Sequence, residues 1–125
     1  MGNVKGSLVA DEGANKIYVK IARKAGWKVK IIPPSARGIS FPDPAIVTQY
    51  TKGIHPIFTS DQLAYTLTKK ELKNSGYIVH KTPRREKAEQ YKEQIRRFFK
   101  KYTEKHTHRT KWTIEFEGEA TAVKI

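Results

Sequence analysis

The sequence predicts an α/β fold of three layers, with a mainly parallel central sheet, a long C-terminal helix and a terminal β-hairpin. Three observations predict it: short apolar runs that read as strands, helical periodicity between them, and a long amphipathic segment before a final alternating run. A chain of 125 residues fits one domain. We expect a parallel βα core with an acidic site over residues 1–83, and the helix and hairpin over 84–125.

The first unit of the core is a strand, a helix and a second strand. Residues 8–10 form a short apolar run, and Ile17 and Ile21 then begin a helical apolar face over residues 14–26. Gly26 suits the position after a helix, and the β-rich run 27–32 follows it. Because a crossover helix joins parallel strands, these two strands should pair in parallel.

The rest of the core repeats this alternation. Asp43 and Pro44 are typical of a helix start, and Gly53 is typical of its end. Residues 55–59 then predict a third strand and 77–80 a fourth, with a helical or partly looped segment at 61–73 between them.

The C-terminal third has the clearest periodicity. Apolar side chains recur at alternating threes and fours, which predicts a helix over about 84–105: Ala88, Tyr91, Ile95, Phe98 and Tyr102. Residues 112–116 then alternate as a half-buried strand. Gly118 permits a tight turn, and 120–125 returns as the hairpin partner. This aromatic helix and the hairpin are the candidate surface for a homodimer.

The formal net charge of +13 points to a polyanionic partner. RNA or another single-stranded nucleic acid is our first expectation, and an anionic membrane surface or an acidic protein is the alternative. The chain has no cysteine, which excludes disulfides, iron–sulfur clusters and thiolate zinc sites. No apolar run approaches the roughly 20 residues of a membrane span, and no signal peptide is seen, so we expect a cytoplasmic protein.

The first 70 residues contain only four acids, against eleven Lys and Arg. Asp11 and Glu12 follow the first strand, Asp61 follows the third, and Asp43 opens a helix. Residues just beyond the strand ends of an α/β sheet gather at its ligand crevice. Carboxylates crowded there would repel one another unless a hard cation such as Mg²⁺ or Mn²⁺ joined them. The sequence therefore predicts a divalent metal site.

Each acid also has a structural explanation. Asp43 and Asp61 could cap the helices that follow them, and Glu12 could favour the first turn of its helix through the macrodipole. Asp11 is the hardest to explain in this way.

Among the basic residues, Arg37 and Lys16 are the candidate phosphate contacts, because Arg37 lies in a loop near the crevice and Lys16 near a helix start. The basic residues at 84–85 and within 96–101 are typical of a solvated helix face. They could also attract a polyanion through their positive charge without specific contacts. His106 and His108 could bind a metal, although such alternate positions on a polar segment are more often solvated. His55 and His80 have no evident catalytic partner, and no Gly-rich phosphate loop is present.

Four motifs give the chain a resemblance to the small PIN-like proteins. Residues 8–12 (Leu-Val-Ala-Asp-Glu), with a helix ending in Ala-Gly-Trp-Lys-Val at 25–29, resemble that family's Asp-Glu-Asn opening. The Arg-Gly at 37–38 with Asp-Pro-Ala-Ile-Val at 43–47 is similar to its second motif. Phe-Thr-Ser-Asp at 58–61 is similar to its third, and the strand, long helix and hairpin of 76–125 match its C-terminal half.

The resemblance implies a PIN-like fold and a Mg²⁺- or Mn²⁺-dependent endoribonuclease, a hydrolase that cleaves phosphodiesters with a metal-activated water. Asp11, Asp43 and Asp61 would be the catalytic residues and metal ligands, with Glu12 as a further ligand. Many relatives look like toxins of toxin–antitoxin pairs, which implies an antitoxin protein as a partner.

Three positions depart from the family pattern. Gly13 replaces the Asn of Asp-Glu-Asn, and Leu63 and Ala64 stand where a further Asp and a Phe are usual. These departures keep an alternative open: a catalytically degenerate PIN-like module that binds nucleic acid or another protein.

Overall fold

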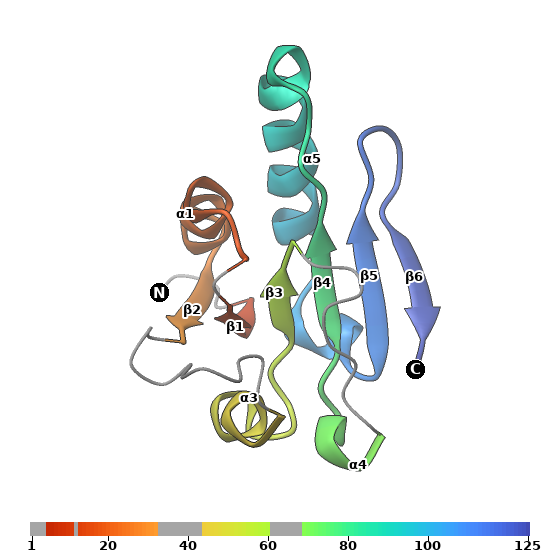
Figure 1. The fold of residues 1–125 in the computed structure, drawn as a ribbon. Coiled ribbons are helices and arrows are strands. Elements are labelled where there is room, and N and C mark those ends of the chain that lie inside the picture. Colours follow the sequence, from red (N-terminus) through yellow and green to blue (C-terminus); the bar gives the residue numbers. More distant parts are fainter. Residues whose placement is uncertain (1–4, 12, 33–43, 61–68) are drawn as a thin grey trace.

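The computed structural model describes residues 5–11, 13–32, 44–60 and 69–125, and shows an α/β fold built on one six-stranded sheet (Figure 1). The strands are β1 (Gly6–Ala10), β2 (Trp27–Ile31), β3 (Ile57–Thr59), β4 (Tyr77–His80), β5 (Thr110–Ile114) and β6 (Thr121–Lys124). The helices are α1 (Lys16–Lys24), α3 (Pro44–Thr51), α4 (Lys69–Leu72) and α5 (Ala88–Lys101), with 3₁₀ helices η1 (Arg85–Lys87) and η2 (Glu104–Thr107).

The strand order is β2-β1-β3-β4-β5-β6. The first five strands pair in parallel, and only the β5–β6 hairpin is antiparallel. This confirms the predicted α/β class and the mainly parallel sheet. Because the strands run in one direction, the carboxyl ends of β1 to β4 share one edge of the sheet, which we call the carboxyl edge.

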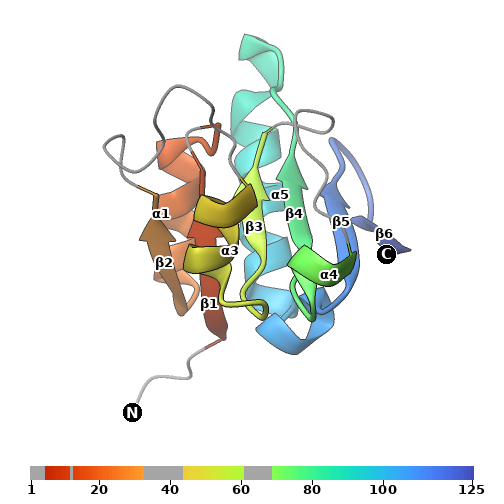
Figure 2. The same ribbon diagram turned by 60° about the horizontal axis from the view of Figure 1, so that its bottom comes forward.

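Helices cover both faces of the sheet. In Figure 2, α3 and α4 lie in front of the sheet, and α1 and α5 lie behind it. The larger core fills the α1–α5 side and includes Leu8, Phe58 and Phe99, each fully buried. The smaller core, on the other side, contains Ile57, Leu72, Tyr77 and Val79.

The apolar stripe of α5 is buried in this larger core, as its periodicity predicts. Tyr91, Ile95, Phe98 and Phe99 are each at most 3% exposed. These aromatic rings therefore belong to the chain's own interior, so a surface for a second copy would have to come from elsewhere. The hairpin does expose apolar side chains, with Phe116 at 41% and Val123 at 64%.

Three predicted boundaries in the C-terminal third were wrong. α5 ends at Lys101, because Tyr102 is extended (φ −107°, ψ 154°) and Thr103 opens η2 with a capping box to His106. β5 covers Thr110–Ile114 rather than 112–116, so Phe116 lies beyond the strand. The hairpin connection runs over 115–120, longer than the tight turn expected at Gly118, although Gly118 has the positive φ (75°) that suits glycine.

Candidate functional site

The carboxyl edge contains the point where the strand order reverses. From β1 the chain passes through α1 to β2 on one side, and later enters β3 on the other side of β1. The helices α1 and α3 lie on opposite faces (Figure 2). In an open α/β sheet, the gap between the carboxyl ends of two such strands is the usual ligand crevice. The fold thus marks the ends of β1 and β3, where the sequence places Asp11 and Asp61.

Asp11 lies directly beside the end of β3. Its backbone N–H donates to the carbonyl of Phe58 (3.2 Å), which extends the pairing of β1 with β3 by one residue. The residue is only 5% exposed, and Oδ1 accepts a hydrogen bond from the Gly13 N–H (2.8 Å). Burial of a carboxylate is costly without such a donor. Asp11 therefore turns the chain from β1 toward α1, in addition to any role with a ligand.

Gly13 separates the Asp11 carboxylate from Ser60 at the end of β3. A Cβ on Gly13 would lie 2.9 Å from Ser60 Oγ and 3.3 Å from Asp11 Oδ1. Any other residue here would displace the serine hydroxyl. This close approach explains the glycine at position 13, where the ends of β1 and β3 lie close together.

His80, at the end of β4, is the feature of this edge that the sequence did not reveal. It is 3% exposed, and its Nε2 accepts a hydrogen bond from the Asn15 N–H (3.1 Å). Nδ1 lies 3.1 Å from the Lys81 carbonyl and therefore carries the proton. Burial lowers the pKa of His80, and the bond to the Lys81 carbonyl opposes this in part. The ring is therefore a neutral group that joins β4 to the start of α1.

Lys16 is the first residue of α1, and it is exposed at the carboxyl edge, where a phosphate could reach it. The helix is capped by Asn15, whose side chain accepts from the Ile17 N–H (2.8 Å). The first turn of the helix contains no acid, and Glu12, for which a helix-dipole role was expected, lies outside the described residues.

The other predicted site residues, Glu12, Arg37, Asp43 and Asp61, lie outside the described residues. Within the described part of the chain, no three His, Asp or Glu side chains form a group that could hold a metal ion. Asp11 is the one predicted ligand in that part. Asp61 follows Ser60 directly in sequence, and Asp43 directly precedes α3.

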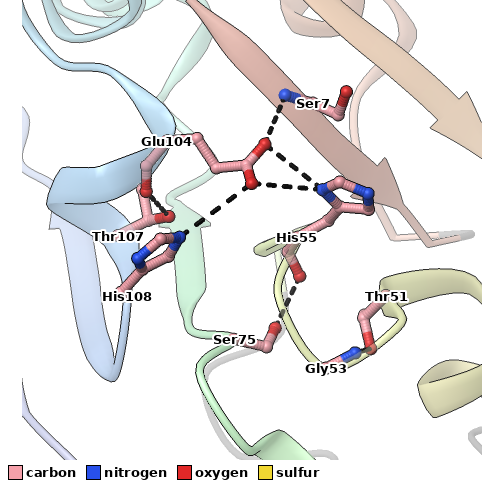
Figure 3. Close-up of polar contacts among 8 residues, drawn as sticks. All are labelled: Ser7, Thr51, Gly53, His55, Ser75, Glu104, Thr107 and His108. Atoms are coloured by element: carbon pink, nitrogen blue, oxygen red, sulfur yellow. Dashed lines mark hydrogen bonds and ion pairs between the residues drawn. The ribbon is translucent and has the colours of Figure 1, made fainter.

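A second polar cluster lies at the opposite edge of the sheet and joins Ser7, His55, Glu104 and His108 (Figure 3). Both carboxylate oxygens of Glu104 lie 3.2 Å from His55 Nδ1, and Oε1 accepts from the Ser7 N–H (2.6 Å). His108 Nε2 is 3.9 Å from Oε2 and has no closer polar partner. We call these four residues the amino-edge cluster; sequence analysis missed it because it placed Glu104 in the long helix.

No protein-family model matches the chain, and no curated protein or solved structure is significantly similar to it. The PIN-like resemblance therefore stays a prediction that rests on the four motifs. In the described residues, no helix is long and apolar enough to cross a membrane.

Proposed function

We propose that this protein is a Mg²⁺- or Mn²⁺-dependent endoribonuclease of PIN-like type that acts at the carboxyl edge between β1 and β3. One observation carries the proposal: the strand order reverses between these two strands, and the buried carboxylate of Asp11 lies at that point. The net charge of +13 adds the long-range attraction that a polyanionic substrate requires.

The ligands of the ion would be Asp11, Asp43 and Asp61, whose oxygens are the donors that Mg²⁺ and Mn²⁺ prefer. A bound ion would supply Lewis acidity to the phosphodiester and lower the pKa of a water molecule. Asp11 suits this role because its position is fixed by the Gly13 N–H and by the backbone bond to Phe58. Lys16 and Arg37 would contact phosphates of the RNA.

The first prediction concerns cleavage of a labelled single-stranded RNA in the presence of Mn²⁺. Asp11→Asn and Asp61→Asn keep the size of each side chain but remove a charged ligand, so each should lower the cleavage rate by about a hundredfold or more. Glu117→Gln is the matched control, because Glu117 is an exposed acid in the hairpin connection. Circular dichroism should show each variant folded, and chelation by EDTA should stop cleavage by the unmodified protein.

Cleavage that survives both aspartate variants would refute the proposed site. The alternative is a PIN-like protein that binds nucleic acid without cutting it, and the positions taken by Leu63 and Ala64 favour it, because they lack the further acid of the family pattern. RNA binding that persists in EDTA, with no cleavage under any metal, would identify this alternative.

A further inference from the structure

A groove of about 430 Å³ runs between α1 and α5, on the face of the sheet that both helices cover. The two helices contact each other directly and lie on the same side of the sheet in both views (Figures 1 and 2). Eight residues line it: Ile17, Lys20, Ile21, Lys24, Ala25, Lys92, Arg96 and Lys100. None of them belongs to the carboxyl edge, so this α1–α5 groove is separate from the site proposed for catalysis.

Two rows of cations face each other across the groove. Lys20 and Lys24 are four residues apart on α1, and Lys92, Arg96 and Lys100 repeat the same spacing on α5. Four residues of helix rise about 6 Å, so each row places one positive charge per turn along the groove.

These cations are only partly neutralised. Lys92 pairs with Glu89, and Arg96 pairs with Glu93. No ion pair joins Lys20, Lys24 or Lys100 to a carboxylate of the described residues. A ligand with negative charge along both of its sides would satisfy both rows.

The floor between the rows is apolar. Ile17, on the first turn of α1, is 49% exposed, Ala25 is half-buried, and Ile21, only 8% exposed, forms the base between them. Among the described residues no aromatic ring lines the groove, whereas single-stranded nucleic acids gain much of their affinity from bases stacked on aromatic side chains. An amphipathic helix fits better, because its apolar side chains recur at i, i+3, i+4 and i+7 and would contact the floor.

We propose that the α1–α5 groove binds an acidic amphipathic helix of a partner protein. Its apolar seam would cover Ile17 and Ala25, and its flanking carboxylates would face Lys20 and Lys24 on one side and Lys100 and Arg96 on the other. The proposal does not depend on the nuclease activity, because Asp11 and the carboxyl edge take no part in it.

The test uses a synthetic, fluorescently labelled helical peptide with Leu at i, i+3, i+4 and i+7 and Glu on both flanks. A scrambled peptide of identical composition and a single-stranded RNA are measured beside it by fluorescence anisotropy on the full chain. The amphipathic peptide should bind at least about tenfold more tightly than the scrambled one, since only it presents a continuous apolar seam. Ile17→Asp and the pair Lys20→Glu with Lys24→Glu should each weaken its binding by about tenfold or more.

The matched control pair is Lys52→Glu with Lys105→Glu, which changes the net charge equally at exposed sites outside the groove. These variants should bind the peptide within about twofold of the unmodified protein at moderate salt. Equal binding of the two peptides, or no binding at about 100 μM, overturns the proposal. Groove variants that weaken RNA binding and leave peptide binding unchanged would overturn it in favour of a nucleic-acid surface. The aspartate variants test RNA cleavage and should bind the peptide as the unmodified protein does, so the two proposals can fail separately.

Discussion

At the scale of single residues, His80 links the carboxyl edge to the pH of the solution. Its neutral ring accepts from the Asn15 N–H and packs against Tyr18 and Phe58, with ring centroids 4.9 and 5.1 Å away. Burial lowers the pKa of His80 below its ordinary value of 6.5. The unfolded chain therefore takes up a proton first as the pH falls, and the folded state loses stability from about pH 6.5 downward to the folded pKa.

We therefore expect the free energy of unfolding in urea to fall between about pH 7.5 and pH 5.5, and to fall less in His80→Gln than in the unmodified protein. Lys105→Gln is the comparison, a change at an exposed side chain away from the carboxyl edge. An identical pH dependence in the protein and in His80→Gln would show that burial does not lower the pKa of His80 in the folded state.

At the scale of secondary-structure elements, the amino-edge cluster connects η2 to the start of β1 and to His55, which lies just before β3. Glu104 is the shared acceptor, and its side chain is 18% exposed. Gly6, at the start of β1, leaves room for it: a Cβ there would lie 2.4 Å from the Cβ of Glu104, and the φ of Gly6 is +139°. The contact therefore depends on both residues.

Glu104→Ala should lower the free energy of unfolding by about 1–3 kcal/mol, because it leaves the Ser7 N–H and the His55 ring without their acceptor. Lys105→Ala, a change at an exposed neighbour, should stay within about 0.5 kcal/mol of the unmodified protein. Urea unfolding followed by tryptophan fluorescence measures both. Equal stability of the two variants would mean that the cluster adds nothing to the fold.

The elements that sequence analysis placed well are those whose periodicity is local. Apolar spacing located α1, the glycine rule placed its end near Gly26, and β4 covers the predicted strand 77–80. The wrong boundaries in the C-terminal third arose where the local helical spacing of apolar residues conflicts with contacts made in the folded structure. Tyr102 continues the helical apolar spacing, yet it leaves the helix and lies against Trp112, with 4.4 Å between ring centroids. Periodicity alone cannot detect such a contact.

At the scale of the whole molecule, metal binding should raise the melting temperature. If Asp11, Asp43 and Asp61 form the proposed site, bound Mn²⁺ would favour the folded state by mass action, by about 2.7 kcal/mol at a concentration 100 times the Kd. A thermal scan with and without about 1–5 mM Mn²⁺ measures this, and Asp11→Asn should reduce the shift. No shift in the unmodified protein would argue against a metal site.

The general location of the candidate site was predictable, because chain order and the strand-end rule place Asp11 and Asp61 at one edge of a parallel sheet. The contact of Ser60 with Gly13 was not, since it depends on the register of β1 against β3. The α1–α5 groove was also beyond sequence reasoning. Its two cation rows lie far apart along the chain, and each alone reads as an ordinary solvated helix face.

The bond between Ser7 and Glu104 spans 97 positions of the chain. During synthesis, residue 104 must leave the ribosome before the start of β1 can form this bond. The basic N-terminal strands would stay incompletely packed until this C-terminal segment has been synthesised. Contacts between residues so distant in sequence also slow folding. Production at low temperature or with chaperones should therefore raise the yield of native protein, and C-terminal truncation before residue 104 should lower it sharply.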